Sequence, residues 1–286
     1  MNPPTIAPIR DADLPEFCRF LAENLSRERA PEEWAKAFTQ HWYPAKPNNG
    51  FLLRHEGRIV GAIGAIYAER SVRGSPERFC NITSWCVLDE FRAQSMRLAI
   101  ALTGQPGFHF TDLTPTEVVS RTLQFLKFRP MDERQALWPN LPWPFAALGG
   151  VRVVTEHARL EQMLDADAAR AYRDHRHLPW LAHAAVGRPG ASCYVVWKRT
   201  RWKGVAGARI LALSDAELFL RHRGAFGSHL LVRHGLSYTR IESRLLPRIP
   251  RLAIEQSGYR HKVFKSETLT AADMSNLYSE LVALDL

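Results

Sequence analysis

The side chains best suited to chemistry gather between positions 86 and 112. Cys86 directly precedes the segment V-L-D-E-F-R-A-Q-S-M-R at residues 87–97, and His109 and Asp112 follow within F-H-F-T-D at residues 108–112. The spacing of the apolar residues indicates a strand over 81–87 that runs into a helix over 89–103. Unsatisfied backbone N–H groups and the positive end of a helix dipole meet at such a junction and attract anions. The expected strand and helix are therefore joined by a turn of the general kind that can attract an anion.

This segment, taken with T-P-T-E at residues 114–117 and L-Q-F-L-K-F-R-P at residues 123–130, resembles the GCN5-related N-acetyltransferase (GNAT) superfamily of CoA-dependent acyltransferases. The resemblance covers residues 5–135 and implies a central mixed sheet flanked by helices. It also implies that the turn holds the pyrophosphate of acetyl-CoA, or of another acyl-CoA, as co-substrate. The residues that it assigns to CoA are Cys86, Val87, Leu88, Arg92, Ala93, Gln94, Ser95, Met96 and Arg97.

The sequence departs from the family pattern at two positions of the turn and at one position in the helix expected over 115–126. Ser95 and Arg97 stand where the family prefers small residues, so Ser95 could add a hydroxyl donor and Arg97 a forked cation. Equally, the longer side chain of Arg97 could fill the space that the pyrophosphate requires. The tyrosine that in the family often protonates the departing thiolate falls at Leu123, which cannot donate a proton.

The resemblance implies direct attack of an amine on the thioester, helped mainly by positioning. In the family the oxyanion is bound by backbone N–H groups of the strand that here ends near Cys86 to Leu88. We expect Asp112 to be the general base, with His109 as second choice, although a strand-end carboxylate also serves as a turn former or a helix cap. Cys86, in an apolar strand, is expected to be a small buried residue and not a nucleophile.

The second half of the chain is more basic than the first. Residues 1–150 carry 17 Lys and Arg against 16 Asp and Glu, whereas residues 151–286 carry 21 against 13, so the excess rises from +1 to +8. This charge fits a solvated surface or an anionic partner. The segment at 221–228 repeats the Arg-x-x-Gly spacing loosely, but its context favours a purely structural role. The aromatic and basic residues at 197–202 are typical of single-strand binders and, equally, of a charged hairpin tip.

Helical and extended patterns alternate along the chain, which favours a mixed α/β or α+β fold. We expect helices over 13–25, 31–42, 89–103, 115–126, 156–173, 216–234, 249–257 and 271–284. We expect strands over 51–54, 58–66, 81–87, 108–112, 193–198, 208–213, 238–244 and 259–265.

The length of 286 residues predicts two domains, since single cores usually stop growing well below this size. The proline-rich stretch at 138–150 is the expected boundary, because proline disrupts both helix interiors and central strands. We therefore assign 1–145 to a GNAT-like acyltransferase domain and 146–286 to a basic C-terminal domain, a diverged second unit of the same kind. Four scattered cysteines and the lack of a long apolar run favour a cytoplasmic protein without a membrane span.

The functional hypothesis is an acyl-CoA-dependent transferase that moves an acyl group, acetyl first among the candidates, to a small-molecule or protein amine. Two alternatives remain open. One is a non-catalytic GNAT-fold binding or scaffolding protein, and the other is a nucleic-acid-associated protein that uses the basic half. No metal site is expected, because the histidine pairs at 175/177 and 222/229 lack further ligands to complete a set of four.

Overall fold

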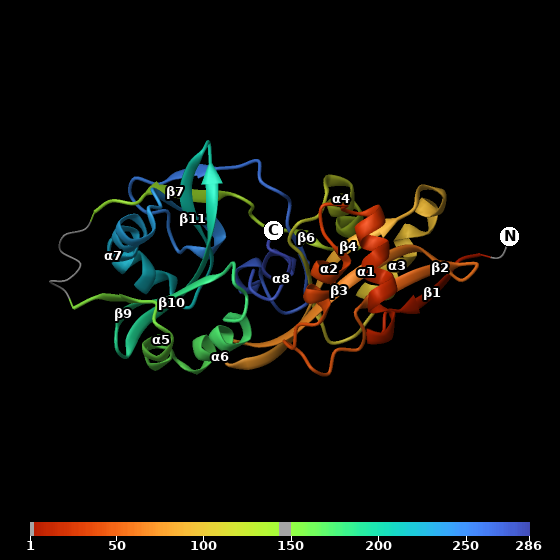
Figure 1. Cartoon of the computed structure of the whole chain (residues 1–286), viewed down its shortest axis with the longest axis horizontal. Helices are drawn as coiled ribbons and strands as arrows, with labels where there is room; N and C mark the ends of the chain where they lie inside the picture. Colours follow the sequence, from red (N-terminus) through yellow and green to blue (C-terminus); the bar gives the residue numbers. More distant parts are fainter. Residues whose placement is uncertain (1–2, 143–149) are drawn as a thin grey trace. The chain divides into compact units, whose positions relative to one another are not determined.

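The chain forms two compact units in the computed structural model, which describes residues 3–142 and 150–286 (Figure 1). The first unit contains Met1–Met131 and Arg260–Leu286, and the second contains Asp132–Tyr259. Within the described residues, no helix combines the length and the apolar character that a membrane crossing requires.

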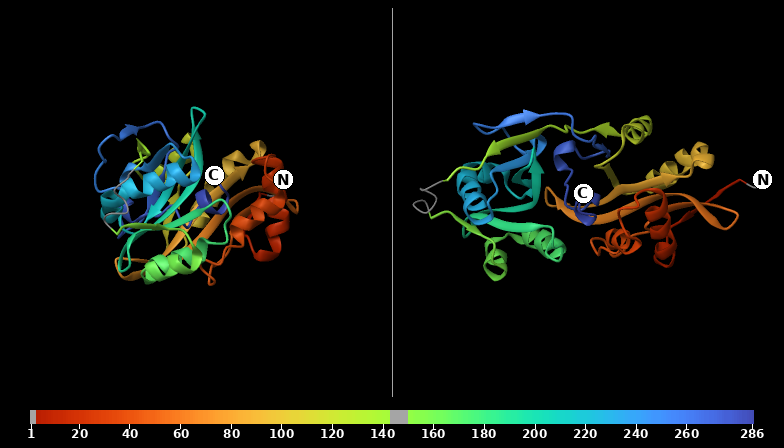
Figure 2. Two further views of the ribbon diagram at one scale, coloured as in Figure 1. Left: turned by 60° about the vertical axis from the view of Figure 1, so that its left-hand side comes forward. Right: turned by 45° about the horizontal axis from the view of Figure 1, so that its top comes forward.

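The first unit is built on a mixed sheet with the strand order β1-β2-β3-β4-β5-β14-β6. Its strands are β1 (Thr5–Pro8), β2 (Gly50–His55), β3 (Arg58–Val72), β4 (Ser75–Val87), β5 (His109–Asp112), β6 (Arg129–Pro130) and β14 (Val263–Lys265). The first four strands form an antiparallel meander, in which β3 and β4 make the long hairpin seen in orange in Figure 2. β5 then joins β4 in parallel, and β14 and β6 continue the sheet antiparallel.

Two pairs of helices accompany this sheet. They are α1 (Leu14–Asn24) and α2 (Pro31–Phe38), between β1 and β2, and α3 (Ser95–Thr103) and α4 (Glu117–Phe125), which follow β4 and β5. A 3-10 helix, η2 (Asp89–Gln94), leads from β4 into α3. Leu98 and Leu102 of α3 and Leu123 of α4 are fully buried in one cluster with the sheet, so these two helices cover the same face. Their apolar spacing is what places them there.

The second unit has its own mixed sheet, in the order β13-β7-β12-β11-β10-β9-β8. Its strands are β7 (Gln135–Pro139), β8 (Arg152–Val154), β9 (Ala182–Arg188), β10 (Ala191–Trp202), β11 (Val205–Leu213), β12 (Tyr238–Glu242) and β13 (Ile254–Gln256). Its helices are α5 (His157–Met163), α6 (Ala166–His175) and α7 (Ala216–His234). β8 to β11 form an antiparallel meander, α7 connects β11 to its parallel neighbour β12, and β7 and β13 follow antiparallel.

Read from the meander outward, the two sheets have the same order and the same strand directions. In both units, the strand beside the parallel pair comes from a distant part of the chain. β14 follows the whole second unit in sequence and returns to pair with β5, whereas β7 precedes the meander of the second unit and pairs with β12. The expected pair of similar mixed-sheet units is therefore present, and each one is completed by a strand from outside its own meander.

The structure divides the chain at 131/132 and 259/260, not at 145/146 as expected. The stretch at 138–150 was expected to be a linker, but Trp138 and Pro139 belong to β7, which pairs with β12 and β13. Proline is tolerated because Pro139 is the last residue of that strand. Residues 143–149 of the predicted boundary lie outside the described residues.

Two helix predictions in the last forty residues are wrong. The region at 249–257 contains the strand β13, because its residues pair with β7. The region at 271–284 contains only the 3-10 turn η5 (Ala271–Asp273) and the short helix α8 (Glu280–Ala283), which packs in the first unit (Figure 1). In contrast, the helix predicted over 216–234 is confirmed as α7.

The returning strand gives a testable prediction for stability. Val263 of β14 is fully buried in the core of the first unit, so Val263→Ala should lower the free energy of unfolding by about 2 kcal/mol. Val232→Ala is the matched control, since Val232 is 70% exposed on α7 and should have little effect. Equal effects of the two substitutions in chemical denaturation would contradict the placement of β14.

Candidate functional site

The first unit opens between its two parallel strands. β4 pairs with β5 only from Phe79 to Asn81, opposite residues 109–111 of β5. β4 then continues to Val87 paired with β3 alone, and its register shifts near Ser84, which has a φ of 52°. A bulge of this kind bends a strand and re-aims the residues that follow it. From residue 82 onward, no strand of the described chain pairs with the β5 side of β4.

A cavity of about 780 Å³ lies at this opening. It is lined by Asn24, Trp85, Cys86, Val87, Leu88, Asp89, Arg92, Ala93, Ser95, Met96, Thr116, Val118, Val119 and Thr122. The end of β4, the turn of η2, the start of α3 and the first half of α4 therefore contribute to one concave site. Of the nine residues that the sequence assigned to CoA, all but Gln94 and Arg97 line it.

Arg97 does not obstruct the cavity. Its guanidinium donates to the carbonyl oxygen of Pro4 at 3.1 Å and to Oε1 of Gln94 at 2.9 Å, and its side chain is exposed. These contacts hold Arg97 toward the N-terminal strand. The proposal that it fills the phosphate space finds no support in this geometry, nor does the idea that it contacts the phosphate directly.

The turn before α3 is wound more tightly than an open phosphate-binding loop. The N–H of Phe91 donates to the carbonyl of Leu88 at 2.9 Å, and the N–H of Ser95 donates to that of Arg92. These two donors are already satisfied within the 3-10 helix η2. An anion here must therefore rely more on the side chains of Arg92 and Ser95. Arg92 is exposed and forms an ion pair of 2.7 Å with Asp89.

Trp85 is the functional candidate that sequence reasoning missed. It lines the cavity, and its buried Nε1 has no hydrogen-bond partner among the described residues. Buried indole N–H groups normally find an acceptor, so the unpartnered N–H distinguishes Trp85 among the residues that line the cavity. The bulge at Ser84 interrupts the alternation of side chains between the two faces of β4. Counting residues along the strand in the sequence therefore did not identify Trp85, the neighbour of Ser84, as a site residue.

The α4 residues that reach the cavity were also not assigned as site residues. Thr116 caps α4 by accepting the N–H of Val119, and Val118 and Thr122 follow on the cavity side. Leu123, the position of the family's tyrosine, is fully buried in the core behind them. The helix therefore presents hydroxyl and aliphatic groups to the cavity, and no phenol.

Cys86 lines the cavity as a neutral thiol. Burial raises the pKa of the Cys86 thiol, although the nearby guanidinium of Arg92 opposes that shift. A raised thiol pKa lowers the fraction of nucleophilic thiolate at neutral pH. Cys86 is half-buried and not fully buried as expected, and its expected lack of a nucleophilic role stays a prediction.

Neither predicted base reaches the cavity. His109 opposes Phe79, seven residues before Cys86 along β4, which corresponds to roughly 20 Å of strand. Its Nε2 lies 3.0 Å from Glu77, and its Nδ1 lies 2.8 Å from the hydroxyl of Ser266. His109 is the first residue of β5 and therefore lies at the end of the β4–β5 pair that is farthest from the cavity. The spacing of residues in the sequence does not show at which end of the pair a residue lies.

Asp112 is buried in the sheet and does not line the cavity. Burial, followed by the neighbouring carboxyl of Glu280, raises the pKa of Asp112 well above its usual value. Burial likewise raises the pKa of Glu280, which accepts hydrogen bonds from the N–H of Leu113 and the hydroxyl of Thr114. Glu280 therefore connects the end of β5 to the C-terminal α8, whereas Asp112 accepts a local hydrogen bond from the N–H of Thr114.

The described residues contain no group of three or more side chains arranged to hold a metal ion.

No protein-family model and no curated protein sequence matches the chain. Solved structures do match. A GCN5-related N-acetyltransferase from Anabaena variabilis superposes with a TM-score of 0.59 at 11% identity and covers 91% of this chain and 72% of that one.

Two other solved structures give the same result. A conserved protein of unknown function from Enterococcus faecalis has a TM-score of 0.59 at 11% identity, with 92% of this chain and 72% of that chain covered. A GCN5-related N-acetyltransferase from Kribbella flavida has a TM-score of 0.55 at 13% identity, with 91% and 70% covered. At these identities the likeness concerns the fold.

The buried carboxyl pair predicts how stability depends on pH. Because the pKa of Asp112 is raised in the folded state, the folded protein holds a proton that the unfolded chain releases, and stability falls as the pH rises above the ordinary carboxyl pKa. Asp112→Asn has no carboxyl group to ionise at this position, so the loss of stability that Asp112 causes at high pH is removed. We expect the variant to melt higher than the wild type at pH 8 and to lose that advantage toward pH 4. A difference in melting temperature that does not change with pH would contradict the assignment.

Proposed function

Because the chain has the fold of the GCN5-related N-acetyltransferases, we propose that it is an acyl-CoA-dependent N-acyltransferase. The observation that carries this proposal is the cavity where β4 separates from β5, bounded by the turn into α3 and by α4. The acyl group, acetyl first among the candidates, moves to an amine of a small molecule or a protein.

The CoA pyrophosphate would lie at the turn, beside Arg92 and Ser95. Arg92 supplies a forked cation, and Ser95 supplies a hydroxyl donor at the start of α3. The dipole of α3 adds positive potential at the same end. Side chains thereby take over part of the binding that free amides would provide in a more open loop.

The thioester would lie along the free side of β4. The amine nitrogen forms a bond to the thioester carbonyl carbon, the carbon–sulfur bond breaks, and the thiolate of CoA leaves and takes a proton. The amine loses its proton to solvent, because the cavity offers only Asp89, already paired with Arg92, as a carboxylate. Backbone N–H groups of β4 beyond residue 82 and the indole N–H of Trp85 are the donors available to the developing oxyanion.

A second candidate function is acyl-CoA binding without transfer. It is favoured by Leu123, which replaces the family's proton donor, and by the absence of both predicted bases from the cavity lining. Release of CoA thiol in the presence of a panel of amines separates the two functions, because only a transferase releases it.

We call the turn with Arg92 and Ser95, which is proposed to hold the CoA pyrophosphate, the cradle. It predicts different effects on acetyl-CoA affinity for substitutions at Arg92 and Arg97. Arg92→Ala should weaken acetyl-CoA binding about tenfold or more in calorimetry, since it removes a charge-assisted contact. Arg97→Ala should leave the affinity unchanged, because Arg97 points away from the cavity. No binding heat from acetyl-CoA or longer acyl-CoAs, or equal losses in both variants, would refute the proposal.

Direct transfer predicts that Cys86 is dispensable for chemistry. Cys86→Ala should keep its rate of thiol release close to that of the wild type and should show no ping-pong pattern in steady-state kinetics. A variant that still binds acetyl-CoA but has lost transfer would contradict this prediction.

A further inference from the structure

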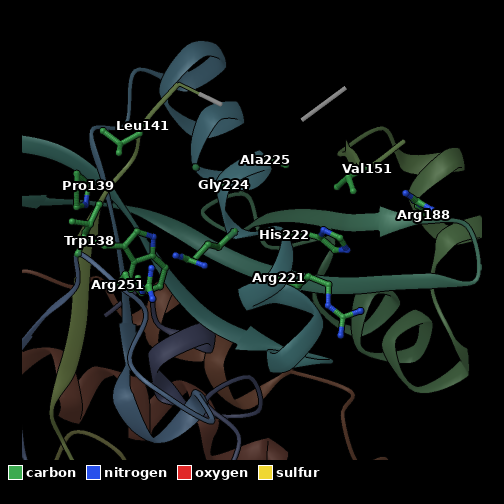
Figure 3. Close-up of a pocket in the computed structure, with 13 residues that line it drawn as sticks. Trp138, Pro139, Leu141, Val151, Arg188, Arg221, His222, Gly224, Ala225 and Arg251 are labelled. Carbon is green, nitrogen blue, oxygen red and sulfur yellow. The ribbon is translucent and has the colours of Figure 1, made fainter. Parts of the chain in front are cut away.

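The second unit contains a separate cavity of about 460 Å³ beside α7, shown in Figure 3. Its lining residues are Trp138, Pro139, Leu141, Val151, Arg188, Arg221, His222, Arg223, Gly224, Ala225, Gly227, Arg251 and Leu252. The cations come from three segments that lie far apart in sequence: the end of β9, the second turn of α7 and the loop before β13. The Arg-x-x-Gly segment of the sequence thus lies within a helix and lines a cavity, and does not form a loop.

Among the described residues, one helix of the first unit has no counterpart in the second. In the first unit, α4 follows β5 and packs against β14. By sheet order β12 corresponds to β5 and β7 to β14, but β12 is followed only by a 3-10 turn at Ser243–Leu245. Pro247 and Pro250 then prevent a helix from forming. The end of β7, with Trp138 and Pro139, is left facing a hollow beside α7.

The hollow is strongly cationic. The second unit, residues 132–259, carries 19 Lys and Arg against 11 Asp and Glu, a net charge of +8, whereas the first unit carries 19 against 18. None of the described lining residues is acidic. Arg221 and Arg251 form no ion pair or hydrogen bond with the described residues, so their guanidinium groups are available to a ligand. Like charges that converge in a concavity repel one another, and a bound anion relieves that repulsion.

The same hollow has an apolar part. The lining includes Trp138, of which only 5% is exposed, and Leu141 and Leu252, which are exposed by 51% and 72%. Figure 3 shows Arg251 close to Trp138, and Arg188 close to Val151, with Arg221 and His222 of α7 between them. The cations are thus distributed along the cavity, and Trp138, Pro139 and Leu141 lie together at one end of it. The volume falls within the usual range of ~300–1,000 Å³ for small-molecule sites.

We propose that this cavity binds a nucleoside diphosphate or a closely similar small molecule, with its phosphates on the arginines and its ring against Trp138 and the two leucines. Arginine forks match phosphate oxygens in geometry and charge. A planar ring covers the exposed apolar surface, which a simple inorganic anion would leave in water. The inference is independent of acyl transfer, since it concerns only the second unit.

Calorimetry with ADP, inorganic pyrophosphate and adenosine tests the proposal on the full-length protein. We expect ADP to bind more tightly than pyrophosphate, adenosine to bind weakest, and the ADP affinity to fall as NaCl is raised. The double variant Arg221→Ala/Arg251→Ala should weaken ADP binding at least about tenfold. Both side chains are exposed, so their loss should leave the fold intact, as a thermal melt would verify.

Two control variants fix the location of the site. Arg233→Ala removes an exposed cation from the other end of α7 and should leave ADP binding unchanged. Because the turn of the first unit is itself proposed to hold a diphosphate, the ADP titrations are repeated with Arg92→Ala, in which the second unit should still bind ADP and the added double substitution should remove that binding. ADP binding that is abolished by Arg92→Ala and retained in the double variant would place the ligand in the first unit and overturn the proposal. Equal affinity for ADP and pyrophosphate would overturn the role of the apolar wall.

Discussion

The separation of β4 from β5 is the constraint on which the candidate site depends. Three residue pairs hold the strands in parallel, and a bulge near Ser84 then directs β4 away along β3 alone. The wedge that results leaves polar backbone groups of β4 without a strand partner, so they can pair with helix termini, with water or with a ligand. The turn into α3 and the first half of α4 border this wedge, and between them they leave the cavity.

The two units show how one sheet order can support different sites. In the first, α4 follows the parallel pair and its Thr116, Val118 and Thr122 reach the cavity at the strand opening. In the second, prolines replace that helix, and the hollow forms over the neighbouring strand and gathers arginines. The second unit, which contains this hollow, is also the more basic of the two units. Small local changes in helix-forming capacity thus relocate the concave surface within a retained sheet.

Much of this arrangement could be predicted from the sequence, and the reasons for the failures are physical. The strand-to-helix junction at 87–97 and the helix α7 follow from local spacing, which sequence reports directly. Pairing between distant segments does not follow from local spacing. The sequence therefore did not predict that β14 returns to the first sheet or that β7 lies between β12 and β13. The same limit explains His109 and Asp112: both were placed on the correct strand, but their distance from the cavity depends on where the parallel pair begins and ends.

The orphaned indole of Trp85 offers the most direct measurement of the central claim, which is that the wedge beside β4 accommodates an acyl-CoA. Its N–H resonance can be identified in a nitrogen-15 NMR spectrum by comparison with a Trp85→Phe variant. On titration with acetyl-CoA, we expect this resonance to shift. If acetyl-CoA leaves the Trp85 resonance in place, or shifts only tryptophans of the second unit, the wedge is not the binding site.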